Sequence, residues 1–233
     1  MVIRVRMSSS GGARVPELVA GDRLTREEFE RRYAATPGLF KAELIEGVVY
    51  VPSPVRHVQH GRPHALLVAW LAHYEAATPG VQVSGNATVR LDGSNVPQPD
   101  VLLFLPRELG GQARVDADGY LSGPPELAAE VTASTASYDL HDKKRAFQRN
   151  GVREYLAWRT EDRALDWFSL RGRRYRSLTA DATGILRSQV FPGLWLDRPA
   201  LVRRDLASVL RTLALGLGSR EHAAFVARLG RRG

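Results

Sequence analysis

Short apolar segments of two different periods follow one another along this chain, and this alternation limits most strongly the folds it can adopt. Residues 101–105 form a continuous apolar run directly after a Pro-Asp dipeptide, which is typical of a strand buried on both faces. Residues 64–77 carry apolar side chains at helical spacing and end before a Pro-Gly pair. Strands mixed with amphipathic helices predict an α/β fold, in which helices flank a central mixed sheet.

The other segments fit the same class. Thr25 begins a capping box that predicts a short helix through Tyr33, and a helix over 139–150 is expected to end at Gly151. Residues 106–125 are rich in glycine and proline without a period and predict a loop. Residues 42–51 are expected to form a strand with a turn at Glu46 and Gly47, and residues 81–83 and 87–91 are expected to form one bent strand. Residues 191–196 are expected to form a closing strand or a flap. Further strands are expected at 127–131, 154–158, 165–170 and 175–178.

Three parts of the chain are predicted. Residues 1–20 form a disordered leader, residues 21–198 form the α/β domain, and residues 199–233 form a C-terminal extension of two helices broken at 216–218. The apolar side chains of the extension must be buried, either on the chain's own sheet or in a homodimer. We expect the homodimer, because it covers more apolar surface. These side chains are Leu206, Val209, Leu210, Leu213, Leu215, Ala223, Phe225, Val226 and Leu229.

The composition excludes several kinds of site and location. The chain has no cysteine, which excludes disulfides, a thiol nucleophile and Cys-ligated zinc or iron–sulfur sites. No apolar run approaches the ~18 residues that a membrane-spanning helix needs. The first ten residues have too short an apolar stretch for a signal peptide. A cytoplasmic protein without membrane contact is therefore expected.

The net charge of +8 is compatible with a nucleic-acid partner. Residues 141–180 carry 11 cations and 5 anions, and residues 201–233 carry 7 cations and 2 anions. Such patches can neutralise the phosphates of a nucleic acid. An arginine-rich surface that is simply solvated explains them equally well.

Three carboxylates lie at the ends of apolar strands, namely Glu43, Asp100 and Glu130. A carboxylate taken out of water is costly unless it is paired or binds a metal. For any one of them, a solvated position just outside the sheet is the simpler interpretation. The helix after Glu130 carries Lys143, however, and a lysine beside two carboxylates suits hydrolysis of a phosphodiester. The carboxylates hold Mg²⁺, and the lysine stabilises the charge that develops on the phosphate.

An ordered set of short motifs surrounds these residues. The set comprises Glu43-Leu44-Ile45-Glu46-Gly47, His60 before a helix, Pro99-Asp100-Val101, residues 126–131, Ser134, Asp139 with Lys143 and Phe147, and residues 151–155. In this order and spacing the sequence resembles the Uma-two family, described as "putative restriction endonuclease", within the PD-(D/E)XK nuclease superfamily. The resemblance extends from about residue 27 to residue 196.

The resemblance implies a restriction-endonuclease-like core of about four strands with a helix on each side. It also implies a metal site of Glu43, Asp100 and Glu130, in which Asp100 and Glu130 are catalytic. The superfamily motif has lysine two residues after the second acid, where this sequence has Thr132. The cation then comes from the next helix, which assigns the catalytic lysine to Lys143.

The expected function is that of a metal-dependent endonuclease acting on DNA, with Mg²⁺ or Mn²⁺ as its cofactor. The carbonyl of Val131 is expected as a further metal ligand, and His60 and Lys144 as phosphate contacts. On a helix, Lys143 and Lys144 differ in direction by about 100°, so only one of them can face the carboxylates. Two alternatives stay open: a catalytically inactive DNA-binding relative and a purely structural protein of the same fold.

Overall fold

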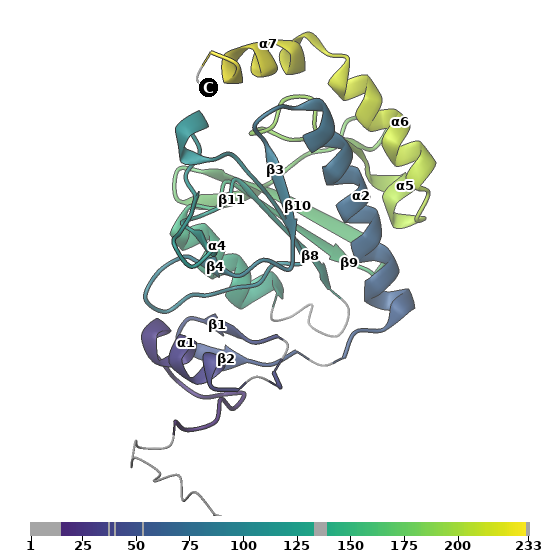
Figure 1. Cartoon of the computed structure of the whole chain (residues 1–233). Coiled ribbons are helices and arrows are strands. Elements are labelled where there is room, and N and C mark those ends of the chain that lie inside the picture. The colour runs from purple at the N-terminus through teal and green to yellow at the C-terminus, as the bar shows by residue number, and fades with distance from the viewer. Residues whose placement is uncertain (1–14, 37, 40, 53, 133–138, 232–233) are drawn as a thin grey trace, which may run out of the picture.

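The computed structural model describes residues 15–36, 38–39, 41–52, 54–132 and 139–231, and a six-stranded mixed sheet lies at its centre (Figure 1). The strand order is β11-β10-β9-β8-β5-β3. The β8–β9 pair is parallel and every other pair is antiparallel. The predicted mixed α/β class is thereby confirmed. The strands are β3 Gln82–Gly85, β5 Val101–Phe104, β8 Leu127–Thr132, β9 Glu154–Arg159, β10 Ala164–Arg171 and β11 Arg174–Ser177.

The two faces of the sheet are buried against different helices. Successive side chains of a strand point to opposite faces, so Leu127 and Ala129 of β8 face the helix α2, Arg62–Ala77, whereas Ala128 faces α4, Lys144–Asn150. Strands β5 and β8 are buried along their whole length, which was expected for β5 from its continuous apolar sequence. Figure 1 shows α2 on one side of the sheet and α4 on the other.

Helix α2 begins earlier than its apolar pattern indicates. A π-helical turn at His57–Gly61 leads into it, and Pro63 lies in its first turn, where a proline costs no hydrogen bond. Trp70 of this helix is fully buried, and its Nε1 donates a hydrogen bond of 3.1 Å to the carbonyl of Trp195. The helix is therefore fixed both to the sheet and to the C-terminal part of the chain.

The C-terminal helices pack on the chain's own domain. They are α5 Arg198–Val202, α6 Leu206–Leu217 and α7 Arg220–Leu229. Val209, Leu213 and Phe225 lie in the same hydrophobic core as α2 and the sheet. The apolar stripe that motivated the homodimer is thus largely covered within one chain, while Leu215 stays 66% exposed. The homodimer stays a prediction, but the need to bury these apolar side chains no longer supports it.

A small N-terminal layer contains α1 Arg26–Ala34 and the hairpin of β1 Glu43–Ile45 and β2 Val48–Tyr50. The predicted helix cap is confirmed, because Thr25 Oγ1 accepts a hydrogen bond from the backbone N–H of Glu28. Residues 1–14 of the predicted leader lie outside the described residues. Leu18 is buried in a cluster with Phe29, so the folded part begins before residue 21.

Two strand predictions need correction. Residues 81–91 do not form one bent strand, because β3 belongs to the central sheet while β4, Val89–Arg90, belongs to a second sheet. That second sheet has the order β4-β7-β6 and takes β6 Arg114–Val115 and β7 Leu121–Ser122 from the segment predicted as a loop. A short 3₁₀ helix, Arg107–Leu109, lies in the same segment. Strands of two residues are too short to show a period, which is why the pattern missed them.

The helix over 139–150 and the closing strand near residue 196 are both found where the sequence predicted them. The predicted helix over 139–150 consists of a π-helical turn, Asp139–Lys143, followed by α4, and Gly151 ends it with φ 84°. Ser134, a member of the motif set, lies outside the described residues. The closing strand is β13, Trp195–Asp197, which pairs with β12, Ile185–Arg187, a strand that the sequence did not predict.

Glu154 at the start of β9 makes folding stability depend on pH. Burial raises the pKa of this carboxyl to about 7, although the backbone N–H of Gln189 and the hydroxyl of Ser188 donate hydrogen bonds to it. Between pH ~4.5 and ~7 the unfolded chain ionises this group while the folded chain keeps it protonated. The free energy of unfolding should therefore fall by up to about 3 kcal/mol as the pH rises through this range.

The Glu154→Gln variant should lose this part of the pH dependence, because glutamine does not ionise. Urea unfolding at several pH values between 4.5 and 7.5 measures it, with Glu161→Gln on the exposed surface as the matched control. Equal losses of stability in the wild type and in Glu154→Gln over this range would contradict the prediction.

Candidate active site

Strands β5 and β8 bring Asp100 and Glu130 opposite one another. Val101 pairs with Ala129 in the antiparallel ladder, so the residue before Val101 lies across from the residue after Ala129. The side chains of Asp100 and Glu130 share the sheet face of Ala128, which is the face that α4 covers. Both carboxylates are buried, with 2% and 3% of the residue exposed.

Lys143 reaches this pair of carboxylates from the π-helical turn before α4. Its Nζ lies 2.8 Å from Glu130 Oε1 and 2.9 Å from Glu43 Oε1, and its side chain is 3% exposed. Buried charges need compensation of this kind, since a single charge in a dry interior is strongly unfavourable. The structure thus brings together the four predicted residues Glu43, Asp100, Glu130 and Lys143.

Glu43 of β1 has a second donor besides the lysine. The backbone N–H of Gln98 donates a hydrogen bond of 2.6 Å to Glu43 Oε1, the same oxygen that Lys143 contacts. Oε1 of Glu43 therefore contacts two donors at once, the backbone N–H of Gln98 and the ammonium group of Lys143. This arrangement favours Glu43 as the carboxylate that holds Lys143 in place.

Asp100 is surrounded by donors and cations. Its Oδ2 accepts a hydrogen bond of 2.8 Å from the N–H of Val131 and lies 3.0 Å from His60 Nε2. Its Oδ1 faces Lys41 Nζ at 3.6 Å, and its backbone carbonyl accepts from His64 Nε2 at 2.9 Å. His60, expected as a phosphate contact, here contacts a carboxylate.

The charges around Asp100 keep it ionised. Burial by itself raises the pKa of this carboxyl, but the hydrogen bond from His60 and the positive charges of Lys41, His60 and Lys143 outweigh burial. The net effect is a pKa below the ordinary value. Asp100 is therefore an anion throughout the neutral range, as a ligand of a divalent cation must be.

Lys41 and His64 lie at the site although neither was among the predicted site residues. Signals for both were present. Lys41 lies two residues before Glu43, and alternate residues of an extended segment share a face. His64 follows His60 by four residues, a spacing that places both on one side of a helix.

Lys144 points away from the carboxylates. Its Nζ lies 3.4 Å from the centroid of the Phe168 ring, and burial lowers the pKa of this lysine although Asp166 partly opposes the shift. Together with His141, Arg145 and Gln148 it lines a hollow of about 340 Å³. Lys144 therefore belongs to a basic outer surface, separate from the buried carboxylates.

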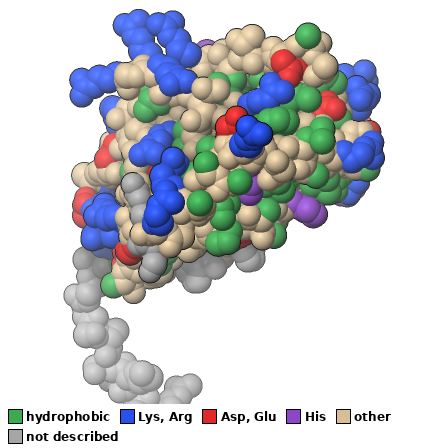
Figure 2. Space-filling model, turned by 90° about the horizontal axis from the view of Figure 1, so that it is seen from above, with side chains coloured by type: hydrophobic (Ala, Val, Ile, Leu, Met, Phe, Trp, Pro, Cys, Tyr) green, Lys and Arg blue, Asp and Glu red, His purple; other side chains and the backbone are tan. Residues whose placement is uncertain are grey.

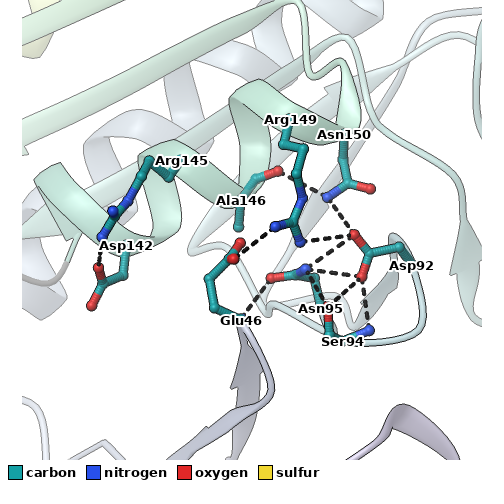
Figure 3. A network of polar contacts seen from close by, with 9 residues as sticks. All are labelled: Glu46, Asp92, Ser94, Asn95, Asp142, Arg145, Ala146, Arg149 and Asn150. Carbon is teal, nitrogen blue, oxygen red and sulfur yellow. Dashed lines mark hydrogen bonds and ion pairs between the residues drawn. The ribbon is translucent and has the colours of Figure 1, made fainter.

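A polar network ties the β1–β2 hairpin to α4 (Figure 3). Arg149 of α4 contacts Glu46 Oε2 at 2.7 Å and Asp92 at 3.3 Å, and Asn150 Nδ2 donates to Asp92 at 2.9 Å. Asn95 Oδ1 accepts from the N–H of Glu46, which holds the turn from the other side. Since Glu43 precedes this turn and Lys143 precedes α4, the network fixes the two ends of their ion pair.

The hard oxygen donors of the site suit Mg²⁺, but a three-ligand cage is not formed. Among the residues that the structure describes, no three His, Asp or Glu side chains are grouped so as to hold a metal ion. Mg²⁺ is commonly bound through one or two carboxylates and keeps several waters, and the ladder register places the two carboxylates Asp100 and Glu130 on neighbouring strands. Thr132 Oγ1, two residues after Glu130, is buried without a hydrogen-bond partner in the described part of the chain. The predicted set of Glu43, Asp100 and Glu130 with the Val131 carbonyl stays a prediction.

Of the comparisons with known proteins, the match to a family model agrees with the resemblance seen in the sequence. No curated protein matches the chain. A solved structure, described as that of "a putative nuclease belonging to DUF820" from Anabaena variabilis ATCC 29413, is 11% identical, covers 72% of this chain and 90% of its own, and has a TM-score of 0.49. The family model Uma2, described as "Putative restriction endonuclease", matches residues 26–199. The chain therefore belongs to the Uma2 family.

Proposed function

We propose that the chain is a metal-dependent endonuclease that hydrolyses phosphodiester bonds in DNA. The observation that carries this proposal is the position of Lys143. It approaches Glu130 from another element, although Thr132 occupies the place of the usual lysine. Two acidic residues on neighbouring strands with a lysine beside them are the groups that metal-assisted phosphoryl chemistry uses.

Each residue has a distinct proposed role. Asp100 and Glu130 would hold Mg²⁺ or Mn²⁺, and when bound, the ion polarises the phosphate and lowers the pKa of a water. Glu43 holds Lys143, and Lys143 supplies positive charge beside the carboxylates. His60 donates a hydrogen bond to Asp100 and so orients the carboxylate. This orientation leaves Oδ1 as the oxygen without a hydrogen bond among the described residues.

DNA is the proposed partner because the surface is basic. The chain carries a net charge of +8, and Lys144 and Arg145 line a surface hollow close in sequence to Lys143. Figure 2 shows several groups of Lys and Arg side chains on the face that is seen from above, some of them beside acidic side chains. Such a surface neutralises backbone phosphates without reading the base sequence.

No helix among the described residues is long and apolar enough to cross a membrane. The cytoplasmic location and the homodimer stay predictions.

Plasmid cleavage tests the proposed function. The wild type should nick or linearise a supercoiled plasmid with Mg²⁺ or Mn²⁺ and should lose this activity in EDTA. Asp100→Ala should lower the rate by ~1000-fold or more, because several kcal/mol of electrostatic stabilisation are removed and each 1.36 kcal/mol is a factor of ten. Glu221→Gln, on an exposed position of α7, is the matched control. Cleavage that persists in EDTA or in Asp100→Ala would refute the proposal.

A catalytically inactive DNA-binding relative is the second candidate. The observation in its favour is the tight engagement of Lys143, which is buried and paired with two carboxylates. Salt-dependent DNA binding that survives EDTA, without cleavage in any divalent metal, would favour this candidate. Absence of both DNA binding and a metal effect would favour a purely structural protein.

A further inference from the structure

The candidate site contains a second lysine that is partly open to solvent. Lys41 Nζ lies 3.6 Å from Asp100 Oδ1, and the side chain of Lys41 is 26% exposed, against 3% for Lys143. Lys41 comes from the segment directly before β1, whereas Lys143 comes from the π-helical turn before α4. The two ammonium groups therefore contact different carboxylates.

Lys143 is poorly placed to meet a substrate. Its ammonium group already contacts Glu43 and Glu130 at 2.9 and 2.8 Å in a buried position. Movement toward a phosphate would take the positive charge away from two buried carboxylates, which is unfavourable. The third lysine of the chain, Lys144, lies over the ring of Phe168.

Lys41 stands at the oxygen of Asp100 that has no hydrogen bond. Oδ2 is occupied by the N–H of Val131 and by His60, whereas Oδ1 faces only Lys41 among the described residues. At 3.6 Å this ammonium group is attracted by charge but is beyond hydrogen-bonding distance. It can thus donate to an incoming phosphate without breaking a hydrogen bond within the described part of the chain.

We propose that Lys41 is a catalytic residue that binds a non-bridging oxygen of the DNA phosphate at Asp100. This inference rests on the proposed nuclease function. It gives the two lysines different roles: Lys143 neutralises the charge of the buried carboxylates Glu43 and Glu130, and Lys41 contacts the substrate. The simpler interpretation is a partly exposed ion pair of Lys41 with Asp100, and such pairs contribute little to stability.

Three variants separate these interpretations: Lys41→Ala, Lys41→Arg and the control Arg220→Ala, which removes one positive charge from an exposed position of α7. Plasmid cleavage at saturating Mg²⁺ gives the first readout. Lys41→Ala should lower kcat about 100-fold, as removal of one preorganised donor to a developing charge typically does. Lys41→Arg should recover part of the rate, and Arg220→Ala should match the wild type.

Binding of a short DNA duplex in EDTA at several salt concentrations gives the second readout. Lys41→Ala should reduce the slope of log K against log salt by about 0.9, the value for one phosphate contact, while Lys41→Arg keeps the slope. An unchanged slope, or an unchanged kcat in an active enzyme, overturns the inference. If the wild type fails to cleave, the proposed function fails and the slope alone decides whether Lys41 contacts phosphate. If the wild type does not bind DNA either, both proposals are wrong.

Discussion

Replacing Lys143 with methionine should lower the free energy of unfolding by about 3–5 kcal/mol, because the change removes one partner of a buried ion pair. The side chains of Glu43 and Glu130 are 4% and 3% exposed, so water cannot solvate these carboxylates in the folded state once the lysine is removed. Urea unfolding at pH 7 measures the loss. Lys144→Met is the matched control, since it removes a neighbouring lysine that is not paired with a buried carboxylate.

A double substitution shows whether the loss comes from the carboxylates. In a Glu43→Gln background, the further change Lys143→Met should cost less than it does in the wild type, because one of the two uncompensated charges is absent. Coupling energies of directly contacting residues are about 0.5–3 kcal/mol. Equal effects of Lys143→Met and Lys144→Met on unfolding would mean that the ion pair with Glu43 and Glu130 is not formed in solution.

Gly111→Ala should destabilise the fold by about 3 kcal/mol or more, since a side chain at this position collides with the backbone. A Cβ at Gly111 would lie 1.7 Å from the carbonyl oxygen of Leu105 and 2.5 Å from its carbonyl carbon. The backbone cannot yield easily, because the N–H groups of Leu105 and Gln112 both donate to the buried carboxylate of Glu126.

The matched control for this change is Gly93→Ala. No atom lies within 4 Å of a Cβ built on Gly93, so the substitution should change the free energy of unfolding by no more than about 0.5 kcal/mol. Thermal and urea unfolding of both variants measure the difference. A Gly111→Ala variant as stable as Gly93→Ala would show that the segment at 105–112 packs differently in solution.

Local features of the sequence predicted the elements that carry the site. The Thr25 cap and the Gly151 end of α4 depend on contacts within a few residues, so their residue types identify them. The apolar run of β5 predicted a strand buried on both faces, 127–131 was predicted as a strand, and the acids beside them predicted a site at the sheet. The second sheet and β12 were missed, because strands of two or three residues carry no period.

The sequence by itself determined the class of fold and the family, and it predicted the residue types of the candidate site. Only the tertiary structure decided which charges meet. Lys143 pairs with Glu43 and Glu130, Lys41 faces Asp100, and Lys144 lies on Phe168. The resemblance and the helix period already assign Lys143 rather than Lys144 to the carboxylates, but the contact of Lys143 with Glu43 and the position of Lys41 depend on how distant elements pack. Ion pairs between distant elements follow from packing and burial, which no local pattern records.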